Sequence, residues 1–251
     1  MYSFQDKVIF VTGSSSGIGK SIILGFSELG ASVIVHGNKN LVAAEQLVAQ
    51  IVAKGKKALL VSGDVTNAKQ VQKMVSKIEQ EFGRVDVLVN NAGSMVKRSR
   101  IEDMEEELWE QIFNVNLKSA FLVTKSVVPL MKKQGKGRII NVTSIAARNG
   151  GGNGAVAYAS AKGGLSTFTR GLAKELIADH IYVNGIAPGF IETPFHSNTS
   201  EEMRVNMTKQ IPLGREGMPE EMVGAVLFLA SDAASYITGE IIEVNGGLLM
   251  D

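Results

Sequence analysis

The sequence predicts an α/β protein with a parallel sheet covered by helices on both faces. Short β-branched runs alternate with longer stretches of helical periodicity along the whole chain, as repeated strand–helix units do. Most of the short runs are continuously apolar, which is typical of strands buried on both faces. No linker rich in proline, serine or charge divides the 251 residues, so we expect a single domain spanning 1–251.

Seven short runs rich in valine and isoleucine are expected to be strands. They are Lys7–Val11, Ser32–Val35, Ala58–Val61, Val85–Val89, Arg138–Val142, Ile181–Ile186 and Ile241–Val244. The helices expected between them have apolar residues at helical spacing. They include Leu41–Lys54, Ala68–Phe82, Leu108–Met131, Tyr158–Leu176 and Glu220–Leu229. Because proline removes a helical hydrogen bond, we expect a kink or a helix end at Pro129.

Composition excludes several classes of protein. The chain has no cysteine, so it forms no disulfide and has no thiolate ligand or cysteine nucleophile. Its 26 basic and 25 acidic residues form no long run of one sign, so we expect no nucleic-acid partner. We see no leader peptide and no 18-residue apolar stretch, and we therefore expect a cytoplasmic protein without a membrane partner. The three histidines are scattered and predict no metal site.

The first expected strand runs into a glycine-rich turn, "TGSSSGIGKS", at residues 12–21. Gly13, Gly17 and Gly19 would let the backbone turn tightly and approach a phosphate at the start of a helix. The same letters nearly match the P-loop of nucleoside triphosphatases, but Ser14 stands where that motif needs glycine. The turn therefore predicts a phosphate or pyrophosphate site.

Tyr158 and Lys162 are four residues apart in an expected helix, so they share one face. A phenol can deliver a proton to a carbonyl oxygen if its pKa, about 10 when free, is brought near working pH. At about 4 Å and an effective dielectric constant of about 20, attraction to an ammonium is about 4 kcal/mol, or about three pKa units. Burial of the phenolate would oppose this shift.

Six motifs stand in order along the chain. They are "TGSSSGIG" (12–19), "NNAG" (90–93), Asn116, Ser144, "YASAK" (158–162) and "PG" (188–189). Together they resemble the classical short-chain dehydrogenase/reductase family over essentially the whole chain. The resemblance implies a Rossmann-type, doubly wound parallel sheet of seven strands and a nicotinamide dinucleotide cofactor. It also implies hydride transfer between that cofactor and a small carbonyl or secondary alcohol.

The resemblance also assigns residues. Those implied for catalysis are Asn116, Ser144, Tyr158 and Lys162, with Asn116 bending its helix and holding a water near the lysine. Those implied to bind the dinucleotide follow the glycine turn and the ends of the strands. They are Gly13, Ser14, Ser15, Ser16, Gly17, Ile18, Gly19, Asn38, Lys39, Asp64, Val65, Asn91, Ala92, Gly93, Tyr158, Lys162, Pro188, Gly189, Ile191 and Thr193.

NADP is expected in preference to NAD. NAD-binding relatives commonly have an acidic residue about 20 positions after the glycine turn, where it bonds the ribose. Here Gly37 stands at that place, and Asn38 and Lys39 follow it. Ser16 keeps NAD open, because many NADP-binding relatives have arginine or lysine at that position.

Two substrate classes stay open. The features most resemble those of bacterial 3-oxoacyl carrier-protein reductases and of glucose-type sugar or polyol dehydrogenases. The apolar residues of an expected lid at about 190–218 suit an acyl chain, whereas Asn149, Asn153 and Asn198 suit a hydroxylated substrate. Ser144 and Tyr158 are fourteen residues apart, slightly more than the family pattern, and the added glycines predict a flexible pocket rim.

Two further alternatives concern assembly and class. The resemblance implies a homotetramer formed through the helices expected at Leu108–Met131 and Tyr158–Leu176. A protein that has kept the fold and lost the chemistry would be a dinucleotide-binding sensor or scaffold. Degenerate catalytic positions would indicate such a protein, but all four implied catalytic residues are present.

Overall fold

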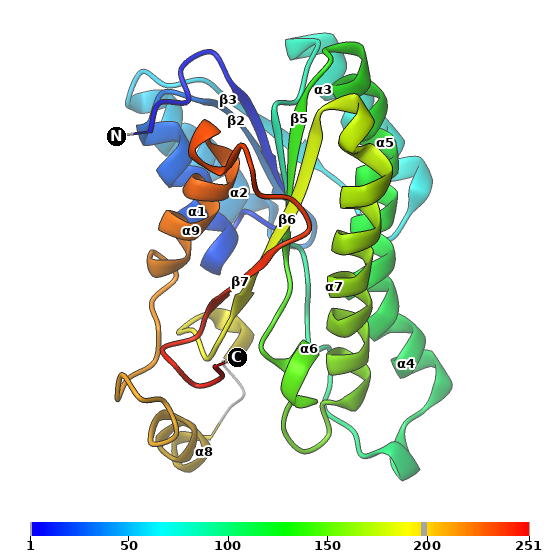
Figure 1. Cartoon of the computed structure of the whole chain (residues 1–251), viewed down its shortest axis with the longest axis vertical. Coiled ribbons are helices and arrows are strands. Elements are labelled where there is room, and N and C mark those ends of the chain that lie inside the picture. Colours follow the sequence, from blue (N-terminus) through cyan, green and yellow to red (C-terminus); the bar gives the residue numbers. More distant parts are fainter. Residues whose placement is uncertain (1, 197–199, 251) are drawn as a thin grey trace.

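The computed structural model describes residues 2–196 and 200–250 and has a seven-stranded parallel sheet at its centre (Figure 1). Its order is β3-β2-β1-β4-β5-β6-β7, and every neighbouring pair is parallel. The strands are β1 (Val8–Val11), β2 (Ser32–Gly37), β3 (Ala58–Ser62), β4 (Val87–Asn90), β5 (Gly137–Val142), β6 (Ile181–Pro188) and β7 (Ile241–Val244). All seven expected strands are confirmed.

Helices cover both faces of the sheet, as the sequence predicts (Figure 1). One face carries α1 (Gly17–Glu28), α2 (Leu41–Ala53) and α9 (Glu221–Ala230), and the other carries α3 (Ala68–Phe82), α5 (Ser119–Lys133) and α7 (Val156–Leu176). Ile9 and Phe10, adjacent on β1, point to the two separate apolar cores and are fully buried. Burial of each such side chain contributes about 1.5–3 kcal/mol, so the central strands form a firm platform for the loops at their ends.

The helix expected at Leu108–Met131 is divided in three. It consists of α4 (Glu106–Phe113), a π-helical turn at Asn114–Lys118 and α5. Asn116 lies at the centre of this turn, where the resemblance implies a bend, and its Nδ2 donates to the Ile112 carbonyl oxygen at 2.8 Å. Such π-helical turns concentrate at functional sites.

Of the kink or helix end expected at Pro129, the helix end is wrong. Helix α5 contains Pro129 and continues to Lys133. The proline is exposed, while Val127 and Leu130 beside it are buried in the core. The carbonyl of Lys125, which loses its helical partner, therefore lies on the solvent side, where water can satisfy it. Packing of the buried face holds the helix together across the missing bond.

The strand order changes direction between β1 and β4. The chain first places β2 and β3 on one side of β1 and then crosses over to place β4 on the other side. In such sheets the loops at this point diverge and leave a crevice at the carboxyl ends of the strands. Short helices α6 (Ala146–Asn149) and α8 (Glu201–Thr208) lie near that end (Figure 1). No helix in the described part of the chain is both long and apolar enough to span a bilayer.

Candidate active site

A cleft of about 1160 Å³ opens at the carboxyl ends of the strands. Most of the residues that the sequence assigns to a site line this one space. They are Gly13, Ser15, Ser16, Gly17, Ile18, Asn38, Lys39, Asp64, Val65, Asn91, Ala92, Gly93, Ser144, Tyr158, Lys162, Pro188, Gly189, Ile191 and Thr193. Ser14, Gly19 and Asn116 are not among the lining residues and lie behind the wall.

The glycine turn is shaped to admit a phosphate. Gly13 and Gly17 have φ angles of 64° and 53°, which side-chain-bearing residues rarely adopt. A Cβ atom on Gly19 would lie 2.5 Å from Asn91 Nδ2, so only glycine lets the turn close against the loop after β4. Helix α1 begins here with no acidic residue in its first turn and no side-chain cap from Ser16. Its free N–H groups fit the pyrophosphate of a dinucleotide.

Ser14 faces inward, contrary to the expectation that it touches the dinucleotide. It is completely buried, and its Oγ donates to the Val11 carbonyl oxygen at 2.8 Å and accepts from the His36 N–H at 2.9 Å. His36 was not expected in the site, yet it lines the cleft and its ring contacts the glycine turn. The sequence feature that could have identified His36 is a polar residue at the end of an apolar strand.

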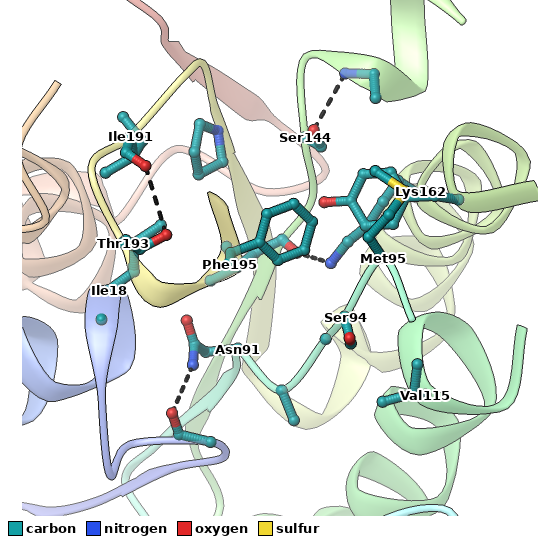
Figure 2. Close-up of a pocket in the computed structure, with 18 of the residues that line it drawn as sticks. Ile18, Asn91, Ser94, Met95, Val115, Ser144, Lys162, Ile191, Thr193 and Phe195 are labelled. Carbon is teal, nitrogen blue, oxygen red and sulfur yellow. Dashed lines mark hydrogen bonds between the residues drawn. The ribbon is translucent and has the colours of Figure 1, made fainter. Parts of the chain in front are cut away.

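The "NNAG" segment ties β4 to its neighbours. Asn91 donates from Nδ2 to the Thr12 carbonyl oxygen at 2.9 Å, and its backbone N–H donates to Thr12 Oγ1 at 3.0 Å. Asn90 is buried and donates from Nδ2 to Asn141 Oδ1 at 2.9 Å. Asn91 therefore holds the edge of the cleft, where Figure 2 shows it, and Asn90 holds the sheet below it.

The end of β2 excludes an acidic side chain. A Cβ atom on the buried Gly37 would lie 2.9 Å from Ala44 Cβ on α2, so a carboxylate there requires the helix to shift. Asn38 and Lys39 line the cleft directly afterwards. Asp64, across from them at the end of β3, has its Oδ1 occupied by the N–H and hydroxyl of Thr66, each at 2.8 Å.

Tyr158 and Lys162 project from α7 into the cleft and are nearly buried, at 8% and 3% exposure. Lys162 Nζ lies 5.8 Å from the centre of the Tyr158 ring and donates to the Val142 carbonyl oxygen of β5 at 2.8 Å. The hydroxyl of Ser144, just after β5, hydrogen-bonds to the phenol and accepts from the Ala146 N–H at 3.1 Å. Three groups able to bind or protonate a carbonyl oxygen thus line the same cleft, and Figure 2 labels two of them, Ser144 and Lys162.

The spacing of Tyr158 and Lys162 predicts that the lysine lowers the pKa of the tyrosine, and the structure corrects this expectation. Burial raises the pKa of Tyr158 to about 12, and the Ser144 hydrogen bond and the charge of Arg98 only partly oppose it. Burial also lowers the pKa of Lys162 to about 8. Among the chain's own groups, desolvation therefore outweighs attraction to the ammonium. The phenol is neutral near pH 7 and is a proton donor in that state.

Asn116 lies behind the cleft wall. It is 1% exposed, its Nδ2 donates to the Ser94 carbonyl oxygen at 2.7 Å, and its Oδ1 accepts from the Ser94 N–H at 3.1 Å. A Cβ atom on Gly93 would lie 2.8 Å from Asn116 Oδ1 and 3.2 Å from Lys162 Nζ. The π-helical turn thus brings the amide close to the lysine, with the loop after β4 held between them.

The rim "NGGGNG" is held by another loop. The Ser99 N–H donates to the Gly154 carbonyl oxygen and Arg98 Nη1 donates to the Asn153 carbonyl oxygen, both at 3.0 Å. These bonds tie the described rim to residues 98–99, although the sequence predicts a flexible segment. Arg98 lines the cleft and was missed by sequence reasoning, although it stands in the basic stretch "VKRSR" after "NNAG".

The residues proposed for a hydroxylated substrate separate in space. Asn149 lines the cleft, whereas Asn153 is not among its lining residues and instead holds Arg98 through its carbonyl oxygen. Asn198 lies outside the described residues, and so does the side chain of His196.

The segment expected to be a lid has two fixed ends. Ile191 and Gly217 form a short parallel bridge, and Arg204 pairs with Glu216 through two bonds of 3.0 and 2.7 Å. Between them, the Phe195 ring lies 5.5 Å from the Tyr158 ring at an interplanar angle of 51°. Met207 and Gln210 also line the cleft, whereas Met203 is exposed and Ile211 is buried below.

Among the described residues, no group of three or more histidine, aspartate or glutamate side chains is arranged to hold a metal ion. A doubly wound parallel sheet, a glycine turn fitted to a pyrophosphate and a buried Ser–Tyr–Lys group define a dinucleotide-dependent oxidoreductase.

The chain belongs to the short-chain dehydrogenase/reductase family, and its residues 13–249 match the family model described as Enoyl-(Acyl carrier protein) reductase. It is 43% identical to the 3-oxoacyl-[acyl-carrier-protein] reductase of Thermotoga maritima, over 98% of this chain and 99% of the relative. It is 40% identical to the Escherichia coli reductase of the same name, over 99% of each chain.

Solved structures of sugar-acid enzymes are similar as well. A putative gluconate 5-dehydrogenase of Beutenbergia cavernae, with bound NADP, has a TM-score of 0.92 and 34% identity over 98% of each chain. A gluconate 5-dehydrogenase of Burkholderia cenocepacia, in complex with NADP and tartrate, has a TM-score of 0.93 and 31% identity over 98% of this chain and 96% of that chain. These neighbours bear out the fold class.

Proposed function

We propose that the protein reduces the ketone of 3-oxoacyl thioesters with NADPH. The observation that carries the proposal is the buried phenol of Tyr158, bonded to Ser144 beside Lys162 and in the same cleft as the glycine turn. A bound reduced nicotinamide supplies the hydride. The Tyr158 hydroxyl gives its proton to the carbonyl oxygen, which becomes the alcohol, and Ser144 holds that oxygen in register.

Lys162 stabilises the phenolate that remains after proton donation. Its ammonium is fixed by the Val142 carbonyl oxygen, so the charge is in place before the proton moves. Asn116 is a positioning residue in this proposal, because it holds Ser94 and Gly93 against the lysine. We propose that its π-helical turn also leaves room for a water beside Lys162.

NADP is the cofactor that the end of β2 favours. The packing of Gly37 against Ala44 leaves no space for the carboxylate that would bond the ribose and repel a 2′-phosphate. Lys39, one of the residues that line this part of the cleft, supplies a positive charge for that phosphate. Two gluconate dehydrogenase structures similar to this chain contain NADP.

The thioester is favoured by the apolar part of the cleft. Met95, Ile145, Phe190, Phe195 and Met207 line it and suit an acyl chain. The curated relatives at 40–43% identity are named 3-oxoacyl carrier-protein reductases. We further propose that the enzyme acts in the cytoplasm as a homotetramer and that the segment at about 190–218 is its substrate lid.

A second candidate is a sugar or sugar-acid dehydrogenase, and Arg98 favours it. Asp64, on the adenosine side, is the only acidic residue among the described residues that line the cleft, whereas Arg98 and Lys162 lie on the substrate side. A carboxylate on the substrate would complement this positive charge. The test is a panel of 3-oxoacyl thioesters, simple ketones, aldoses, polyols and aldonic acids, followed by nicotinamide absorbance. The highest kcat/KM for a thioester supports the proposal, a preference for aldonic acids supports the second candidate, and NADPH binding without any turnover identifies a sensor.

A further inference from the structure

The imidazole of His36 is fixed at both nitrogens in the floor of the cleft. The ring is 2% exposed, its Nδ1 lies 2.8 Å from the backbone N–H of Gly13, and its Nε2 lies 2.9 Å from the carbonyl oxygen of Gly63. A backbone N–H can only donate, so Nδ1 must accept, and a carbonyl oxygen can only accept, so Nε2 must donate. The two partners therefore select the neutral imidazole with its proton on Nε2.

This ring joins the ends of three adjacent strands. Gly13 follows β1, His36 belongs to β2 and Gly63 follows β3. The bond to Gly13 fixes a residue with a φ of 64°, and the backbone N–H of His36 donates to Ser14 Oγ in the same turn. The first part of the phosphate-binding turn is thus tied to the sheet through one side chain.

We propose that His36 is a positioning residue for dinucleotide binding and that it holds the glycine turn only while its ring is neutral. A protonated ring carries a hydrogen on both nitrogens, so Nδ1–H would face the N–H of Gly13 and the bond would be lost. Affinity for the dinucleotide then falls in acid. The inference rests on the proposed binding of NADP(H) by this turn.

The charges around the ring set the direction of its titration. Burial lowers the pKa of His36 below 6.5, while the Gly63 carbonyl and the charge of Asp64 partly oppose that shift. Lys39, three residues after His36, is exposed and lines the same cleft. The neutral ring is therefore present at pH 7 and above, and the acceptor at Nδ1 is lost only as the pH falls below the ordinary range of histidine.

The test measures the Kd of NADPH by its fluorescence between pH 7.5 and pH 5.0. In His36→Asn the amide oxygen takes the place of Nδ1 and does not titrate. We expect the affinity of the wild type to fall more steeply than that of His36→Asn as the pH approaches 5.0, by up to about tenfold, the value of one lost hydrogen bond. The 2′-phosphate of NADPH titrates near pH 6 in both experiments, so the ratio of the two Kd values at each pH removes its contribution. His180→Asn, which removes an exposed histidine from the opposite end of the sheet, should follow the wild type.

A second measurement needs no variant. Nitrogen-15 NMR of the wild-type imidazoles should show one histidine that keeps the Nε2–H form and has a pKa below the ordinary value of 6.5. An equal pH dependence of the Kd in wild type and His36→Asn would overturn the inference. Tighter binding of NADPH in acid would also overturn it, because it would mean that the protonated ring attracts a phosphate. If the wild type binds no NADPH at pH 7.5, the proposed function fails instead.

Discussion

The ammonium of Lys162 donates to the carbonyl oxygen of Val142 at 2.8 Å, which ties α7 to the end of β5. The side chain is nearly buried, so this bond compensates part of the cost of removing a charge from water. The lysine is thereby held next to Tyr158 and does not swing freely. Its position depends on the sheet as much as on the one-turn spacing in the helix.

Replacement of Tyr158 by phenylalanine should abolish most turnover and leave NADPH binding nearly unchanged. The variant keeps the ring that packs beside Phe195 and loses only the proton donor. General acid catalysis contributes about 10²- to 10⁴-fold, which is the expected loss in kcat. Tyr236→Phe, at a fully exposed tyrosine, is the matched control. Undiminished turnover of Tyr158→Phe would refute the proposed proton donor.

Carbonyl reduction should slow as the pH rises through about 8. Lys162 has a pKa lowered to about 8, so it carries its charge below that pH and loses it above. The Tyr158 phenol, with a pKa of about 12, stays protonated throughout this range. We expect kcat/KM of the wild type to fall by about tenfold per pH unit beyond pH 8. In Lys162→Met, kcat/KM should be low and should not change with pH over this range. A wild-type plateau reaching pH 10 would contradict the assignment.

Gly19→Ala should destabilise the protein and weaken NADPH binding. The added methyl would lie 2.5 Å from Asn91 Nδ2 and 2.6 Å from the Gly13 carbonyl oxygen. Overpacking of this kind costs about 1–3 kcal/mol, measurable by urea unfolding. Gly171→Ala, in α7 with no heavy atom within 4 Å of its added Cβ, is the control and should be neutral or stabilising by up to about 1 kcal/mol. Equal effects of the two substitutions would show that the turn has space to spare.

Arg98→Gln should distinguish the two substrate classes. If a substrate carboxylate meets the guanidinium, kcat/KM for aldonic acids falls by about 10- to 100-fold, the value of a hydrogen bond to a charged group. Reduction of neutral thioesters should change much less. Lys97→Gln removes a neighbouring charge that is exposed and is not among the residues lining the cleft. The same loss for charged and neutral substrates would show that Arg98 does not recognise a substrate carboxylate.

The strands were predictable because short, continuous runs of valine and isoleucine favour extended structure and are typical of strands buried on both faces. The glycine turn and the Tyr158–Lys162 pair were predictable for a similar reason, since each depends on residues close together in sequence. Pro129 was misjudged because the effect of a proline depends on whether the carbonyl it leaves unpaired faces water. Tertiary packing decides which side of the helix faces water, and the residues adjacent to the proline in sequence do not reveal it.

Long-range contacts explain the remaining differences. Ser14 is turned inward by His36, 22 residues away, and Arg98 reaches the site through a carbonyl 55 residues away. The protonation of Tyr158 was misjudged because spacing supplies the distance to an ammonium but not the depth of burial. Such properties emerge only when separate loops meet at the ends of the strands.

The bonds that join residues 98–99 to Asn153 and Gly154 also bear on protein engineering. A rim transplanted from a relative would arrive without the loop that supports it, and a new loop without the rim would leave the Ser99 N–H without its acceptor. Altering the range of accepted ketones therefore calls for a paired graft, in which both segments are exchanged together and their lengths are matched.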